Sequence, residues 1–313
     1  MQRVLSTAAL LGLLIATAAA FAITERLKLV RSPVFDAVVS KRLSPTCGCA
    51  RGKAHIRLRL RHGDRVTLWI LDSNDQVVRT LAGGVVLPQG PARWVWDGKD
   101  DIGDLLPDGV YRPEIHLARQ RRTILFPDRI SLDTHAAHVE SVQVSRGIVS
   151  PDGDGVGDSI KIHYRLDSQA HLLVYLGSDI VIRSRSFLAS GSVDWLGRDA
   201  NHQPLPAGNY VLWLGSVDRA GNVTPSYERQ PVVVTVRYIS LSPTTLSEHP
   251  GQRFTVAVDT DAKKWWWKFA GRKGVSSGPT LALHAPTKPG HYRIAVGERR
   301  YGARASVVVT AAR

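Results

Sequence analysis

The chain has 313 residues, of which 43% are hydrophobic, and 41 lysines and arginines against 27 acidic residues give a formal net charge of +14. This length predicts two or three domains, and the hydrophobic content suffices for an ordinary core in each. Only two cysteines are present, which excludes a small fold built on disulfides. A chain with this positive charge is expected to bind anionic partners such as nucleic acid, acidic lipid headgroups or wall polymers. The alternative is a basic, soluble surface without a specific partner.

The N-terminal segment is apolar. An uncharged run rich in Leu and Ala extends from Val4 to Ile23, and as a helix it would be about 30 Å long, the thickness of the hydrocarbon core of a bilayer. We therefore predict a signal anchor or transmembrane helix over residues 1–24, followed by a basic linker over residues 25–40. The small residues of Ala18–Ala22 also fit a cleavage site, so a removable signal peptide is the alternative.

The charges that flank this segment conflict with the orientation that we favour. Arg26, Lys28 and Arg31 follow the segment, whereas only Arg3 precedes it, and the positive-inside rule would leave the body in the cytoplasm. Long domains, however, translocate largely regardless of nearby charge. We predict a single-pass protein of the cell membrane with its body extracytoplasmic, or a secreted protein if the segment is cleaved. A cytoplasm-facing basic protein that binds nucleic acid is a less favoured alternative.

A cassette occurs twice in the body. Residues 96–111 are WDGKDDIGDLLPDGVY, and residues 195–210 are WLGRDANHQPLPAGNY. Repetition on this scale indicates two copies of one supersecondary unit, so we expect the shared residues to maintain the fold by filling the core and forming turns. The structural repeat positions are Trp96, Gly98, Gly109 and Tyr111 in the first copy and Trp195, Gly197, Gly208 and Tyr210 in the second.

Apolar and polar residues alternate through the rest of the body, for example in His55–Leu60 and Phe254–Val258. Such alternation predicts half-buried strands, and no segment of the body longer than a turn or two has a convincing helical period. The sequence therefore predicts an all-β body of tandem β-sandwich domains, each of roughly 100 residues. The expected domains are 41–134, 135–238 and a C-terminal domain without the cassette, 239–313.

The first cassette resembles a known family. The sequence V-R-T-L at residues 78–81, followed by the pattern W-D-G-x-D…G…P-x-G-x-Y, is similar to the Ig-like repeat of the flagellar hook-capping protein, the FlgD type. The second copy departs from this pattern at Leu196 and His202. The resemblance implies two FlgD-like Ig domains followed by a third Ig-like domain, as in bacterial surface and secreted proteins. It does not imply a flagellar role, because nothing here resembles the assembly-directing N-terminal region of a hook cap.

An acidic, glycine-rich loop is a candidate metal site. Asp152, Asp154 and Asp158 take positions 1, 3 and 7 of the spacing found in calcium loops, whose carboxylate oxygens suit a hard cation. Val156 and His163 stand at positions 5 and 12, where further ligands are expected. Calcium is therefore the one possible cofactor that we name, and an Asp/Gly turn without metal is the alternative.

Cys47 and Cys49 are separated by a single glycine. In an oxidising compartment we expect them to close a small local disulfide. Free thiols, an intermolecular bridge and metal ligation remain as alternatives.

A segment rich in tryptophan and lysine stands out in the last domain. On a strand, Trp265 and Trp267 would share one face and Trp266 would take the other. Stacking and charge would suit a glycan or an anionic polymer, and two core tryptophans beside a solvated basic edge are the alternative. The candidate binding residues are Trp265, Trp266, Trp267, Lys263, Lys264 and Lys268.

The sequence contains no G-x-S-x-G elbow, H-E-x-x-H motif or Gly-rich phosphate loop, so we predict a protein without enzymatic activity. We expect a membrane-tethered, extracytoplasmic Ig-like repeat protein with a structural or adhesive role in the bacterial cell envelope. Its expected partners are the membrane and, in addition, anionic wall polymers or other surface proteins. A module that binds wall polysaccharide through its C-terminal domain is the alternative function.

Overall fold

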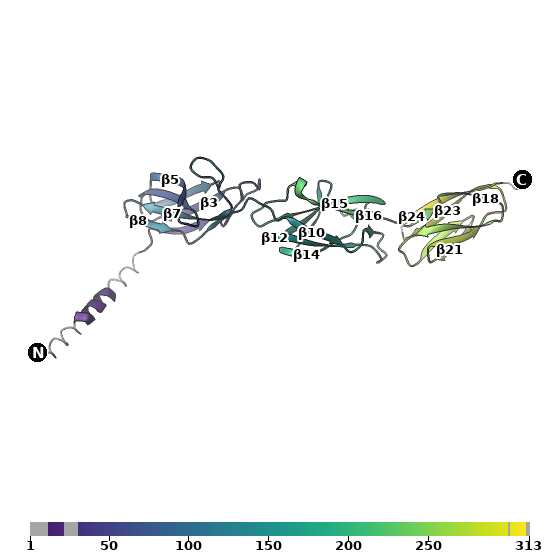
Figure 1. Ribbon diagram of the computed structural model, residues 1–313, viewed down its shortest axis with the longest axis horizontal. Helices are drawn as coiled ribbons and strands as arrows, with labels where there is room; N and C mark the ends of the chain where they lie inside the picture. Colours follow the sequence, from purple (N-terminus) through teal and green to yellow (C-terminus); the bar gives the residue numbers. More distant parts are fainter. Residues whose placement is uncertain (1–11, 22–30, 300, 311–313) are drawn as a thin grey trace. The chain divides into compact units, whose positions relative to one another are not determined.

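The computed structural model describes residues 12–21, 31–299 and 301–310 (Figure 1). Residues 12–21 are helical, and the remainder consists of strands and turns apart from one turn of 3-10 helix, η1 (Ser226–Glu228). The expectation of an all-β body is therefore confirmed. Of the residues described, none belongs to a helix long and apolar enough to cross a membrane. The anchor predicted over residues 1–24 lies for the most part outside the described residues.

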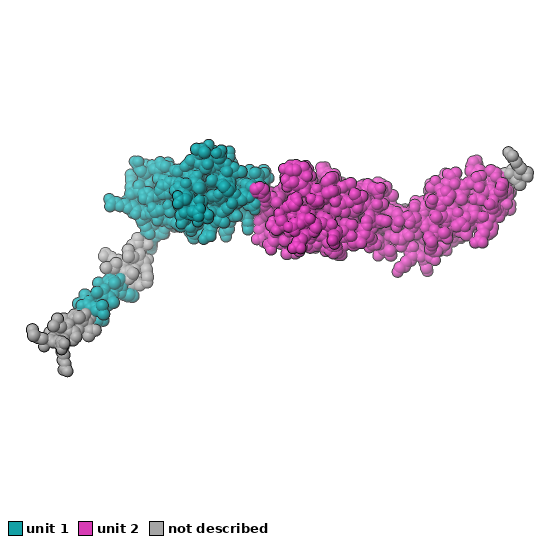
Figure 2. Space-filling view, in the orientation of Figure 1, with its two compact units in different colours: residues 1–134 teal, residues 135–313 magenta. Residues whose placement is uncertain are grey.

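The chain divides into two compact units, of which the first is Met1–Thr134 (Figure 2). This unit contains one β-sandwich. Its strands in chain order are β1 (Val34–Val39), β2 (Arg42–Leu43), β3 (Ala54–Leu60), β4 (Asp64–Leu71), β5 (Val77–Leu87), β6 (Gly90–Trp96), β7 (Gly109–Leu117), β8 (Arg122–Leu125) and β9 (Ile130–Leu132). One sheet has the order β1-β3-β6 and the other β2-β9-β7-β4-β5, with β8 paired to β7. Buried and exposed residues alternate along β3 and β4, so each strand sends every second side chain into the core.

The first domain begins earlier than we predicted, because part of the expected linker 25–40 is strand β1. Val39 pairs with Ile56 of β3, but the register shifts between Phe35 and Val38. Such a bulge breaks the alternation of inward and outward side chains, which hides this strand from a search for period-two patterns. The linker prediction is therefore wrong for residues 34–39.

The second compact unit, His135–Arg313, contains two further sandwiches. The strands of the second domain are β10 (Val139–Val144), β11 (Ile148–Val149), β12 (Ile160–Leu176), β13 (Asp179–Arg183), β14 (Leu188–Trp195), β15 (Gly208–Val217) and β16 (Gln230–Val236). Those of the third domain are β17 (Ser240–Ser242), β18 (Thr245–Glu248), β19 (Arg253–Asp259), β20 (Trp265–Phe269), β21 (Arg272–Ser276), β22 (Thr280–His284), β23 (Gly290–Glu298) and β24 (Tyr301–Val309).

All three domains share one strand order. In the second domain the long strand β12 passes from one sheet to the other, pairing first with β10 and β14 and then with β13 and β15, so it takes the place of both β3 and β4. The sheets of the third domain, β17-β19-β22 and β18-β24-β23-β20-β21, match β1-β3-β6 and β2-β9-β7-β4-β5 strand for strand. The C-terminal domain is thus a third copy of the topology, although it lacks the complete cassette.

Each domain closes with a parallel pair of strands. The short strand β2 lies parallel to the last strand of its path, β9, and the pairs β11–β16 and β18–β24 repeat the arrangement. Two residue pairs form this contact in each of the first two domains, and four form it in the third, from Thr245–Ser306 to Glu248–Val309.

The domains have separate hydrophobic cores. One cluster of buried side chains extends from Val34 to Leu132, a second from Ala137 to Val236, and a third begins at Ile239. The largest fully buried side chain in each is a tryptophan: Trp96, Trp195 and Trp265. Because each core is complete within its own domain, the chain has an array of modules in place of one large body.

Candidate functional site

The two cysteines lie in the turn between β2 and β3. The structure joins Cys47 and Cys49 in a disulfide, with the two Cα atoms 5.2 Å apart. Gly48 between them has a φ of +59°, a left-handed conformation that glycine adopts without strain. The two cysteines thus form the small local disulfide that we expected from their spacing.

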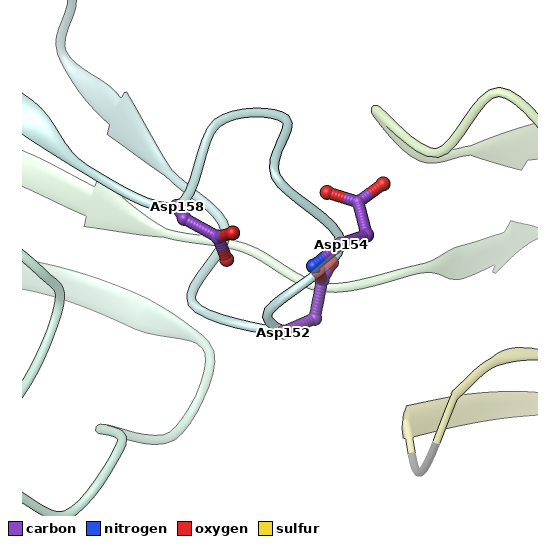
Figure 3. Close-up of side chains that lie close together, drawn as sticks. All are labelled: Asp152, Asp154 and Asp158. Atoms are coloured by element: carbon purple, nitrogen blue, oxygen red, sulfur yellow. The ribbon is translucent and has the colours of Figure 1, made fainter.

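The acidic loop between β11 and β12 carries all three predicted calcium ligands (Figure 3). One carboxylate oxygen from each of Asp152, Asp154 and Asp158 can lie within 4.8 Å of the others. Backbone N–H groups of the same loop, however, already donate hydrogen bonds to these carboxylate oxygens. Asp158 accepts hydrogen bonds from the N–H groups of Gly153 and Gly155 at 2.6 and 2.8 Å, so both of its oxygens hold the turn in shape.

Asp152 also belongs to a second group of carboxylates, which sequence reasoning missed. One oxygen each of Asp152, Asp261 and Glu298 lies within 4.8 Å of the others. Asp261 stands in the turn between β19 and β20, and Glu298 ends β23, so two of the three come from the third domain. Asp152 and Glu298 are 5% and 4% exposed, respectively. We call Asp152, Asp261 and Glu298 the junction cluster.

Burial and mutual repulsion raise the pKa values in the junction cluster. Burial is the main cause for Glu298, and with the negative charge of Asp152 it raises the pKa of Glu298 to about 7, although a hydrogen bond from Thr260 opposes the change. Burial likewise raises the pKa of Asp261, and the charges of Asp152 and Asp154 add to the effect. The folded structure therefore disfavours three bare carboxylates here.

Other contacts fix the second and third domains around this cluster. The rings of Tyr238 and Tyr301 stack with centroids 4.2 Å apart, and Arg237 pairs with Asp259 at 3.0 Å. A Cβ atom on Gly157 would lie 2.1 Å from Asp261 Oδ2. Only glycine at position 157 lets the acidic loop approach Asp261 so closely.

The tryptophan-rich strand β20 separates its indoles as period two requires. Trp265 is 1% exposed and belongs to the core, and the partly buried Trp267 packs against that core. Trp266 lies on the opposite face, over Gly297, where a Cβ atom would come within 2.3 Å of its ring. Lys268 Nζ lies 5.5 Å from the centre of the Trp266 ring.

Trp266 and Lys268 line a groove with a volume of about 670 Å³, together with Tyr301 and Arg304. Lys263 and Lys264 are exposed before the strand and do not line this groove. The structure therefore brings together two of the six predicted binding residues and adds Arg304, which the sequence pattern around residues 263–268 did not indicate.

The repeated cassette packs in the same way in both copies. The indole nitrogens of Trp96 and Trp195 donate hydrogen bonds to the carbonyls three residues later, at 2.9 and 3.1 Å. A Cβ atom on Gly98 would lie 2.7 Å from Pro45, and the repeat shows the same contact. In that copy, a Cβ atom on Gly197 would lie 2.9 Å from Pro151. The repeated glycine therefore packs closely against a proline in both copies, Pro45 in the first and Pro151 in the second.

The cassette tyrosine is the third residue of its strand, and its hydroxyl donates a hydrogen bond to the preceding turn. The Tyr111 hydroxyl donates to the Pro107 carbonyl at 2.7 Å, and Tyr210 donates to the carbonyl of Pro206 at 2.9 Å. Tyr292 repeats this with the residue four positions upstream, at 2.9 Å. Such a tyrosine corner is a hallmark of Ig-like sandwiches. The sequence P-G-H-Y at residues 289–292 resembles the P-x-G-x-Y end of the cassette and could have indicated a tyrosine corner in the third domain.

Residues 47–120 match the family model of the FlgD Ig-like domain. The resemblance inferred from the cassette is thus confirmed for the first domain. In this FlgD-like domain the V-R-T-L segment has a visible role: Arg79 donates a hydrogen bond to the carbonyl of Asp100, and the N–H of Thr80 donates to Asp101 Oδ1 at 2.9 Å. The segment therefore holds the cassette loop against β5.

Several solved structures are similar to this chain in part. The I9–I11 tandem of titin is 10% identical and covers 88% of this chain and 100% of its own, with a TM-score of 0.32. FlgD from P. aeruginosa is 21% identical and covers 44% of this chain and 89% of its own, with a TM-score of 0.24. The D0–D1 region of intimin is 10% identical and covers 55% and 99%, with a TM-score of 0.22. No curated protein matches this chain, and the fold assignment rests on strand order and the tyrosine corners.

Proposed function

We propose that this protein is a non-enzymatic Ig-like repeat protein, tethered to the membrane with its body extracytoplasmic, that has a structural or adhesive role in the bacterial cell envelope. The observation that carries the proposal is the succession of three sandwiches with one strand order, each closed around its own core. Modules of this kind present surfaces and set distances, and they keep their fold when surface loops vary.

Two further features support the extracytoplasmic placement. The local disulfide between Cys47 and Cys49 is of a kind that persists in oxidising compartments. The apolar run from Val4 to Ile23 supplies a tether or a secretion signal. Basic residues after that run favour the opposite orientation, and topology is therefore the first property to test.

Protease accessibility measures the topology directly. Spheroplasts that express the full chain with a C-terminal epitope tag are treated with proteinase K, and a cytoplasmic protein serves as the control for lysis. We expect the tag to be lost while the cytoplasmic control stays intact. Protection of the tag until detergent is added would refute the extracytoplasmic placement and favour the cytoplasm-facing alternative.

A second candidate function rests on the groove beside β20. An indole face flanked by Lys268 and Arg304 offers stacking and positive charge to an anionic polymer. We propose wall polysaccharide or another anionic polymer as its ligand. Co-sedimentation of the full chain with purified cell walls tests it, using Trp266→Ala and, as a matched control, Trp213→Ala, which removes a 37% exposed indole from the second domain.

We expect the Trp266→Ala variant to bind walls several-fold more weakly, because it loses stacking worth about 1 kcal/mol, and the Trp213→Ala variant to bind as the natural chain does. Equal binding by the natural chain and both variants would reject the groove as the binding surface.

A further inference from the structure

The junction cluster joins segments that are far apart in the chain. Asp152 comes from the β11–β12 loop of the second domain, Asp261 from the β19–β20 turn and Glu298 from the end of β23. This group of carboxylates is not a property of one acidic loop, because two of its three members belong to the third domain. Asp152, on the loop of Figure 3, is common to both acidic groups.

Within the described residues, hydrogen bonds reach part of this cluster, but no ion pair neutralises its charge. Glu298 is 4% exposed, and although its Oε2 accepts a hydrogen bond from Thr260 Oγ1 at 2.7 Å, its Oε1 is buried and has no hydrogen-bond partner. In the described part of the chain, no lysine or arginine forms an ion pair with any of the three carboxylates. Buried like charges at this separation repel one another, and a buried acceptor without a partner costs free energy.

We propose that Asp152, Asp261 and Glu298 bind one calcium ion between the second and third domains. The side-chain donors are all oxygens, which hard divalent cations prefer, and calcium tolerates the irregular geometry of ligands drawn from three segments. The hydroxyls of Ser150 and Thr260 bond to cluster carboxylates and offer further oxygens beside them. The inference depends only on this geometry and not on the proposed function.

The arrangement differs from the loop site expected from sequence spacing. Asp158 has both oxygens engaged by backbone N–H groups of its own loop, and Asp154 Oδ1 accepts from the N–H of Val156 at 2.6 Å. Asp152 is also engaged, since its Oδ1 accepts from the N–H of Asp154 at 2.9 Å and its Oδ2 from the Ser150 hydroxyl at 3.0 Å. The feature that distinguishes the junction cluster is the buried Glu298 Oε1, which has no hydrogen-bond partner. Arg198, Arg299 and Asp152 line an adjacent hollow of about 470 Å³. The positive charge of an arginine, or a proton bound to one of the carboxylates, would therefore compete with a cation for the negative charge of the cluster.

Calcium held in this way would link the two sandwiches. One ligand belongs to the second domain and two belong to the third, so an ion bound to all three opposes their separation. The loop, the β19–β20 turn and the end of β23 should then exchange their backbone hydrogens more slowly when calcium is present. A site confined to the loop would protect the loop alone.

Isothermal titration calorimetry of the full chain with calcium chloride, after treatment with a chelator, tests the proposal. We expect one site per chain, and because the number of charged ligands sets the affinity, Glu298→Gln and Asp261→Asn should each raise the Kd about tenfold or more. Asp158→Asn distinguishes the two candidate sites, because Asp158 belongs to the loop group and not to the junction cluster. This variant should change the Kd by only about twofold. Asp194→Asn removes an exposed acid from β14 and should leave the Kd unchanged.

Hydrogen exchange measured by mass spectrometry on the same samples supplies the second readout. Calcium should slow exchange in peptides that cover residues 150–158, 259–262 and 296–299 of the natural chain, and not in Glu298→Gln. Where near-ultraviolet circular dichroism shows that Glu298→Gln has not folded, Asp261→Asn decides, since Asp261 is only half-buried.

Three results would overturn the proposal. The first is an absence of binding heat at millimolar calcium. The second is unchanged affinity in both Glu298→Gln and Asp261→Asn. The third is loss of binding in Asp158→Asn with full retention in Glu298→Gln, which would place the ion in the loop.

Discussion

At the scale of single residues, Asp64 of the first domain is a charged side chain that is fully buried. Its carboxylate accepts hydrogen bonds from the backbone N–H groups of Arg65 and Arg119 at 2.7 and 2.8 Å, and from both the backbone and the side chain of Gln120. Burial alone would raise the pKa of Asp64, but these hydrogen bonds outweigh it and lower the pKa below its usual value. Sequence reasoning missed this role, because three of the four donors belong to Arg119 and Gln120, which are 55 and 56 residues away along the chain.

Replacing Asp64 with Ala should destabilise the first domain by about 2–4 kcal/mol, since several buried donors lose a charged acceptor. Because the folded pKa is depressed, the stabilisation is present above the unfolded pKa of about 3.9 and is lost as the pH falls through the folded pKa. Hydrogen exchange of first-domain peptides between pH 3 and 7 should therefore show a flatter acid dependence in the variant. Asp104→Ala, on the exposed cassette loop, is the control and should stay within about 0.5 kcal/mol. Equal acid dependence in both proteins would contradict the assignment.

His202 departs from the cassette pattern at a position where the backbone still follows it. Its φ is +61°, and Gly103 at the matching position has a φ of +97°. A left-handed conformation costs a residue with a Cβ atom roughly 1 kcal/mol that glycine does not incur. We expect His202→Gly to stabilise the second domain by up to about 1 kcal/mol, measured by hydrogen exchange of peptides around residues 195–210. A loss of stability would show that the histidine side chain makes a contribution larger than the strain.

At the scale of elements, the sequence was most informative where alternation and the cassette coincide. Strands β3 and β4 and both cassettes could be predicted because every inward position except Asp64 is apolar, and because the β3–β4 turn and the cassette turns carry Gly or Pro. Strand β1 was hidden by its bulge. The junction cluster was hidden for a different reason: Asp152 and Glu298 are 146 positions apart in the printed sequence, and only the docking of one sandwich on the next brings them together.

The tyrosine corner of the third domain is the element that most clearly shows the limit of pattern matching. Tyr292→Phe removes the hydroxyl that bonds to the Lys288 carbonyl and should destabilise that domain by about 1 kcal/mol. Tyr227→Phe is a matched control, because the Tyr227 side chain is 84% exposed, and should have no measurable effect. Hydrogen exchange in peptides of β23 and β24 measures the effect of Tyr292→Phe, and peptides that cover η1 measure that of Tyr227→Phe. Equal effects would remove the tyrosine corner as a stabilising element.

At the scale of the whole molecule, three complete cores imply that one domain can lose its structure while the others retain theirs. The second and third domains are the exception, since stacked tyrosines, an ion pair and the junction cluster connect them. Damage to one of these two domains should therefore reach the other through their shared contacts, to an extent that calcium would increase.

The parallel strand pair that closes each domain has a mechanical consequence. When a strand near the start of a sandwich pairs in parallel with the last strand, tension along the chain runs along both strands. The hydrogen bonds between them lie across that direction and are sheared, so that all of them resist together. The pairs β2–β9 and β11–β16 have two residue pairs each, whereas β18–β24 has four. Stretching single molecules of the full chain should therefore rupture the first two domains at lower force than the third, and an equal or reversed order would show that other strands bear the load.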